Sequence, residues 1–78
     1  MPTPNHPKLP LCSQLAAQRE RHLFAFWFDA LLTDPSQEIQ QADAYRLMGM
    51  LAAYQEQEQL HTSDMVAELR AFAFGATA

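Results

Sequence analysis

Apolar residues recur at helical spacing in three stretches of the chain, which are separated by two short polar breaks. The stretches cover residues 13–32, 35–60 and 63–74. In the third stretch, apolar side chains stand at i, i+1, i+4, i+7 and i+8, which is the spacing of a buried helix face. We therefore predict an all-α fold, in which residues 13–78 form a single three-helix domain.

Both breaks contain residues that favour the start of a helix. At the first, Asp34 can act as N-cap, Pro35 suits the first helical position and Gln37 can complete a capping box. At the second, either Thr62 or Ser63 can cap the helix that follows. These signals predict that new helices begin at about residues 35 and 63.

The chain has two glycines, one placed to end a helix and one inside a predicted helix. Gly75 follows the last predicted helix, where glycine commonly ends a helix. Gly49 lies inside the second helix, where glycine costs about 1 kcal/mol relative to alanine. It indicates either the close approach of another helix or a defect that the fold tolerates.

The first predicted helix changes character along its length. Residues 18–22 are polar all round, whereas apolar side chains between residues 23 and 32 cover roughly two thirds of the helix circumference. A three-helix monomer can seldom bury one helix on so many sides. We therefore expect a homodimer, with an interface to the second copy or to another partner formed by Phe24, Trp27, Phe28 and Leu31.

The size of the chain also favours self-association. A chain of 78 residues buries only about 60–65% of the surface that its unfolded form exposes, so it needs a disulfide, a metal, very good packing or a second copy. Cys12 is the only cysteine and cannot form an internal disulfide. Its place beside the start of the first helix indicates either a thiol activated by the helix dipole or a small packed residue.

Residues 1–12 contain four of the five prolines. Proline fixes φ, removes a backbone donor and disfavours helix in the residue before it. We therefore predict an extended, proline-rich N-terminal arm over residues 1–12. Its Pro-x-x-Pro matches indicate either a ligand for an aromatic-lined groove or simply a stiff arm.

Composition and motifs argue against catalysis. Catalysis needs a nucleophile or base oriented by a third group, or a metal with an open position. His6 lies in the arm, His22 lies in the polar part of the first helix, and His61 has only Asp64 beside it as a second metal ligand. We expect no enzyme activity, no metal, no cofactor and no small-molecule substrate.

Hydropathy indicates a folded protein away from membranes. Apolar residues make up 49% of the chain and charged residues 18%, and the longest apolar run, residues 23–28, is too short to span a bilayer. No signal-peptide pattern is present. Because Asp29 follows the apolar run and membrane-surface helices are rich in Lys and Arg, we expect a cytoplasmic protein with no membrane partner.

Charge is unevenly distributed along the chain. Residues 1–22 carry three cations and one acid, whereas residues 23–78 carry two cations and eight acids. Nucleic-acid binding depends on clustered Lys and Arg, so Lys8, Arg19 and Arg21 are the candidate contacts to nucleic acid. The acidic remainder favours a protein partner.

Residues 8–12 followed by two helices resemble the ribbon-helix-helix repressors. In that family a short strand pairs with its twin, and its outward side chains read the major groove. The resemblance implies a strand with Lys8, Pro10 and Cys12 facing DNA. We do not assign the chain to the family, because Pro10 would remove a donor from the strand ladder.

Two functions follow as expectations. The first is a small non-enzymatic, homodimeric helical protein that binds another macromolecule as an adaptor, inhibitor or regulatory module. The alternative is a small dimeric DNA-binding transcriptional regulator that uses the basic arm and the start of the first helix. The charge distribution places a protein partner ahead of DNA.

Overall fold

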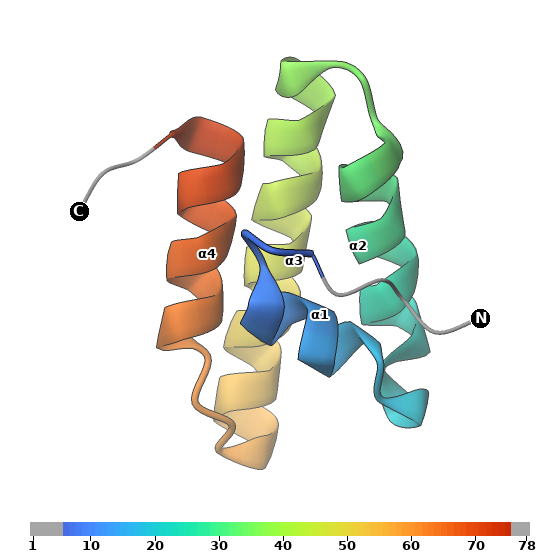
Figure 1. The fold of residues 1–78 in the computed structure, drawn as a ribbon. Helices are drawn as coiled ribbons and strands as arrows, with labels where there is room; N and C mark the ends of the chain where they lie inside the picture. The colour runs from blue at the N-terminus through green and yellow to red at the C-terminus, as the bar shows by residue number, and fades with distance from the viewer. Residues whose placement is uncertain (1–5, 76–78) are drawn as a thin grey trace.

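The computed structural model describes residues 6–75. Within this range the chain forms four α-helices and one short 3-10 helix, and no β-strand (Figure 1). The elements in chain order are α1 (Pro10–Ala16), η1 (Arg19–Arg21), α2 (His22–Thr33), α3 (Gln37–Glu58) and α4 (Ser63–Phe74). The predicted all-α class is confirmed, and the predicted number of three helices is wrong by one.

The four helices pack around a common core, with α2 and α4 each contacting both α3 and α1. α2, α3 and α4 run alternately up and down, with α3 packed on both of its neighbours (Figure 1). The short α1 also packs on α2 and α4, and it lies across the opening between them on the side opposite α3. The core is therefore closed on its fourth side by the N-terminal helix of the same chain.

The prediction of one helix over residues 13–32 is wrong, because the chain breaks at its polar segment. α1 ends at Ala16, Gln18 takes an extended conformation (ψ 136°), and α2 begins only at His22. The polar stretch has no apolar face to bury, so breaking the helix there sacrifices little hydrophobic burial. That turn folds α1 back against α2.

The predicted extended arm is also wrong for its last residues. Pro10 occupies the first turn of α1, where its fixed φ suits a helix and its missing N–H is not needed. Residues 8–12 therefore hold no strand, and the implied likeness to ribbon-helix-helix repressors fails at this segment. Residues 6–9 of the predicted arm form a turn, in which the N–H of Leu9 donates to the carbonyl oxygen of His6 at 3.1 Å. Residues 1–5 of the arm lie outside the described range.

The start of α3 differs from the prediction, whereas the bounds of α4 agree with it. α3 begins at Gln37 rather than at Pro35, and Ser36 is its N-cap, accepting the N–H of Ile39 at 3.5 Å. Asp34 instead accepts the N–H of Ser36 at 3.0 Å, which makes the turn before the helix. The predicted range of the last helix, 63–74, is confirmed.

Thr62, Gly75 and Gly49 also had roles predicted from sequence. Thr62 stands at the N-cap of α4, but its hydroxyl donates to Gln55 Oε1 at 2.8 Å instead of capping. Gly75 ends α4 with φ +62°, the left-handed stop that was predicted. A Cβ on Gly49 would meet nothing within 4 Å, so no other helix of this chain approaches it closely.

The core uses side chains from all four α-helices and from the residue before α1. Its fully buried large members include Phe24 and Phe28, whose rings stack with their centroids 6.2 Å apart. α1 and its flank contribute Leu9, Cys12 and Leu15. The remaining large core residues are Leu31, Leu47, Leu51 and Leu69.

Candidate interaction surface on α2 and α3

Three of the four residues predicted to bind a partner are in the core of a single chain. Phe24, Phe28 and Leu31 have no exposed surface. They are covered inside the domain, where α3 and α1 both pack on α2 and the Phe24 ring lies 6.3 Å from the Tyr54 ring of α3. Only Trp27 is still partly exposed, so the predicted interface cannot form as proposed while this fold is intact.

A different side of α2 carries the exposed apolar residues. Leu23 is 55% exposed and Phe26 is 62% exposed, although both are large apolar side chains. At 3.6 residues per turn, Trp27, Leu23 and Phe26 follow one another around the helix from the edge of the core toward solvent. They form one continuous apolar flank on α2.

Trp27 joins this flank to α3. Its ring meets the Phe26 ring edge to face, with centroids 5.1 Å apart and planes at 89°. On the other side the guanidinium carbon of Arg46 lies 4.1 Å from the centroid of the Trp27 ring. This cation–π contact fixes the indole between the two helices and contributes about 0.5–1 kcal/mol at an exposed site.

α3 extends the apolar surface along the same side. Ile39, Arg46 and Met50 stand at i, i+7 and i+11, so they share the side of α3 that adjoins α2. Ile39 is 51% exposed, and Met50 is partly buried against the core. We define the α2–α3 face as Leu23, Phe26, Trp27, Ile39, Arg46 and Met50. Arg46 is its one charged member, and its charge is already placed over an aromatic ring.

Leu23, Phe26 and Ile39 were not among the residues predicted from sequence to bind a partner, and the reason is physical. A helix that is apolar on most sides does not reveal which side faces its own core. The pattern places Phe24, Phe28 and Leu31 on one side of α2 and Leu23 and Phe26 on another. The packing of α1 and α3 on α2 decides which of the two sides is exposed.

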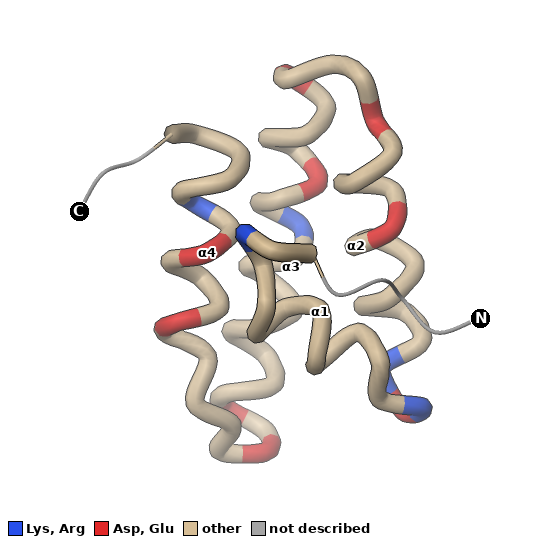
Figure 2. The backbone as a smooth tube through the Cα atoms, viewed as in Figure 1, with Lys and Arg blue, Asp and Glu red and all other residues tan. Residues whose placement is uncertain are grey.

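The three candidate nucleic-acid contacts do not form one patch in a single chain. Lys8 precedes α1, whereas Arg19 and Arg21 follow it, so a seven-residue helix of about 10 Å separates them (Figure 2). Lys8 and Arg19 are exposed. The DNA-binding alternative stays a prediction, and it would have to gather these cations from more than one chain.

Arg21 is already engaged inside the fold. Its Nη1 donates to Glu58 Oε2 at 2.7 Å and its Nη2 to Glu58 Oε1, which makes a bidentate ion pair. The guanidinium also lies 4.3 Å from the centroid of the Tyr54 ring. These hydrogen bonds raise the pKa of Arg21 and lower the pKa of Glu58. Arg21 therefore ties η1 to the end of α3 rather than facing a ligand.

Cys12 is a packed residue rather than an activated thiol. It is fully buried, and its Sγ donates to the carbonyl oxygen of Met65 at 3.5 Å. Burial raises the pKa of the Cys12 thiol far above its usual range, and the nearby Glu68 carboxylate raises it further. This direction is opposite to the one that the activated-thiol interpretation requires.

Neither a cluster of metal ligands nor a membrane-spanning helix occurs among residues 6–75. Among residues 6–75, no three His, Cys, Asp or Glu side chains converge on one point as metal ligands would. His6 packs edge-on against Phe72, with ring centroids 5.4 Å apart. Over the described range, no helix has both the length and the apolarity needed to cross a bilayer.

Together, these features define a small all-α domain whose most distinctive surface is the uncovered apolar α2–α3 face. Comparisons with protein-family models, with curated proteins and with solved structures found no match to this chain.

Proposed function

We propose that this protein is a non-enzymatic interaction module that associates with a second copy of itself through the α2–α3 face. The observation that carries the proposal is the exposure of Phe26 (62%) and Leu23 (55%) beside Trp27 on one side of α2. Full burial of one such side chain contributes about 1.5–3 kcal/mol relative to leaving it in water. A two-fold dimer uses each of these residues twice.

The charge distribution supports a second copy as the occupant of this face. Each chain carries a net charge of -4, so two copies repel one another over most of their surface. The α2–α3 face contains no acidic residue, and its one cation is stacked on Trp27. The face thus brings no carboxylate of its own to the contact, and Asp29, three residues after Phe26 on α2, lies at its border.

The rest of the surface would then be free for another protein. In the dimer, Glu38, Glu56 and Asp64 of α3 and α4 stay exposed, because they lie outside the α2–α3 face. A basic surface on a partner would complement them. This arrangement supports the role of adaptor, inhibitor or regulatory module that binds a protein.

The oligomeric state of matched variants tests the proposal. Light scattering coupled to size-exclusion chromatography would be run over a roughly hundred-fold range of protein concentration, because dimerisation follows mass action. We expect the wild type to form dimers as concentration rises and the double variant Leu23→Ser, Phe26→Ser to stay monomeric. Trp27 fluorescence should shift to shorter wavelength on dimerisation, as the indole leaves water.

Tyr45→Ser is the control, because Tyr45 is 65% exposed and lies on the other side of α3. It should dimerise as the wild type does. Circular dichroism establishes that each variant is folded. A wild type that stays monomeric at every concentration, or a double variant that dimerises as well as the wild type, would overturn the proposal.

A further inference from the structure

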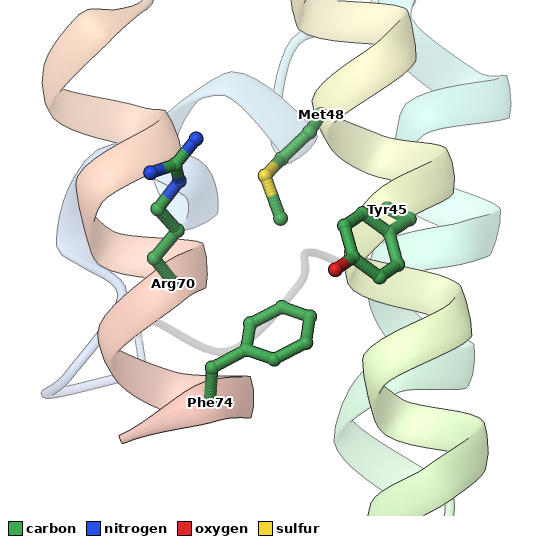
Figure 3. Close-up of a pocket in the computed structure, with 4 residues that line it drawn as sticks. All are labelled: Tyr45, Met48, Arg70 and Phe74. Carbon is green, nitrogen blue, oxygen red and sulfur yellow. The ribbon is translucent and has the colours of Figure 1, made fainter. Parts of the chain in front are cut away.

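A pocket between α3 and α4 is separate from the α2–α3 face. It has a volume of about 320 Å³ and is lined by Tyr45, Met48, Arg70 and Phe74 (Figure 3). Tyr45 and Met48 lie on the side of α3 that adjoins α4, whereas Arg46 and Met50 lie on the side that adjoins α2. The two surfaces therefore belong to opposite flanks of the same helix.

The walls of the pocket are apolar and aromatic. The Tyr45 and Phe74 rings are in contact, with centroids 5.0 Å apart and planes at 57°. The Met48 side chain points into the space between the two helices, and the Tyr45 hydroxyl is directed toward the same space (Figure 3). Aromatic faces and a flexible thioether suit an apolar side chain of varied shape.

Arg70 supplies the one charge of this pocket. Its side chain is exposed at the end of the pocket that is farther from Phe74 (Figure 3). Over residues 6–75, no carboxylate lies within ion-pair distance of it, although the chain carries nine acids. A guanidinium offers a planar set of donors that matches a carboxylate in two parallel hydrogen bonds.

The volume of the pocket and the exposure of its walls indicate the kind of ligand. Its volume is at the lower end of the range of about 300–1,000 Å³ that holds small-molecule ligands. One of its walls, Tyr45, is 65% exposed, so a free small molecule would keep much of its surface in water. The shape suits a single anchoring side chain that is presented by a larger partner, whose other contacts spread over the neighbouring surface.

We propose that the α3–α4 pocket binds an apolar side chain of a partner protein, with a neighbouring carboxylate of that partner paired to Arg70. The apolar side chain packs between Tyr45, Met48 and Phe74. The carboxylate accepts hydrogen bonds from the guanidinium at the rim. The recognised chemistry is thus an acidic residue next to an aromatic or large aliphatic one.

Two matched dipeptides test this inference: acetyl-Phe-Glu-amide and its neutral counterpart, acetyl-Phe-Gln-amide. Each would be titrated into the protein while NMR signals of Tyr45, Met48 and Phe74 are followed. We expect saturable shifts at these residues and about two- to five-fold tighter binding of the Glu peptide, the range for an exposed ion pair.

Charge variants identify the cation that is responsible for the preference for the Glu peptide. Arg70→Gln should abolish the preference for the Glu peptide and leave the weaker apolar binding. Arg19→Gln removes the same charge from an exposed site beyond α1 and should keep the preference. Equal affinities for the two peptides, a preference that survives Arg70→Gln, or no shifts at the three residues would each overturn the inference.

The inference does not depend on dimerisation. The titration would be repeated in the Leu23→Ser, Phe26→Ser variant, whose changes lie on the other flank of the bundle. The same preference there would support the pocket even if the α2–α3 face proved not to bind a second copy. If this variant lost the preference for the Glu peptide, the pocket would not be independent of the α2–α3 face.

Discussion

Glu68 of α4 caps the first turn of α1 by accepting the backbone N–H of Cys12, 56 residues away in sequence, at 3.0 Å. Its other carboxylate oxygen accepts the N–H of Leu11 at 3.0 Å. α1 has no side-chain cap of its own and no acid in its first turn. Glu68 therefore supplies both the missing acceptor and the negative charge that the positive end of the helix favours.

Removing this cap should destabilise the whole domain, because α1 covers the core. We predict that Glu68→Gln lowers the free energy of unfolding by about 1–2 kcal/mol, because the amide loses the charge and one of the two acceptors and leaves one backbone N–H without a partner. Glu56→Gln, at an exposed position of α3, serves as the control and should change stability little. Urea denaturation measures both. An equal effect of the two substitutions would show that the cap does not stabilise α1.

Gly49 should be replaceable by alanine with a gain in stability. A Cβ there meets nothing within 4 Å, and its backbone is helical, so only the helix propensity of the residue changes. We predict a gain of about 1 kcal/mol for Gly49→Ala.

Gly75→Ala is the matched comparison for that substitution. The backbone of Gly75 has φ +62°, which costs an L side chain about 1–2 kcal/mol, so this variant should be less stable than the wild type. Thermal unfolding followed by circular dichroism distinguishes the two. Destabilisation by Gly49→Ala would indicate that something covers this part of α3 in solution.

The buried thiol of Cys12 should make stability depend on alkaline pH. Burial raises its pKa in the folded state above the unfolded value of 9.0, so the folded protein keeps the proton that the unfolded chain releases. The contribution is thus fully present below pH 9 and is lost as the pH rises above it. The free energy of unfolding should fall there by up to about 1.4 kcal/mol per pH unit from this group.

In Cys12→Ala, the free energy of unfolding should lack the decrease above pH 9 that the thiol causes. The cavity left by the missing sulfur will lower its stability at neutral pH. In the wild type, a thiol reagent such as Ellman's reagent should react only as fast as the protein opens. Rapid reaction of the folded protein, or identical alkaline slopes for the two proteins, would contradict the burial of this thiol.

The Arg21–Glu58 pair should contribute to stability only above acidic pH. Its hydrogen bonds lower the pKa of Glu58 from 4.5, so the contribution is present above that pH and is lost as the pH falls through the folded-state pKa. We predict that the stability difference between wild type and Glu58→Gln narrows as the pH falls below 4.5. Added salt should also narrow it, since Glu58 is exposed. A difference that is independent of pH and salt would rule out the ion pair as its source.

The part of the candidate surface that could be predicted from sequence was limited to Trp27. Its neighbours Leu23 and Phe26 belong to the same apolar stretch, but the pattern alone could not show that they lie outside the core. Phe24, Phe28 and Leu31 have the same character in sequence and are fully buried. The distinction comes from α1 and α3, which together cover one side of α2 and leave the other side open.

The sequence by itself determined the all-α class, the range of α4 and its glycine stop, because helical periodicity and a left-handed end are local properties of the chain. Only the tertiary structure decided that residues 13–32 break in two and that α1 begins at Pro10. The reason is that α1 is too short to be stable alone and has no side-chain cap of its own. It depends on an acceptor from α4 and on the apolar sides of α2 and α4, which come together only when the whole chain folds.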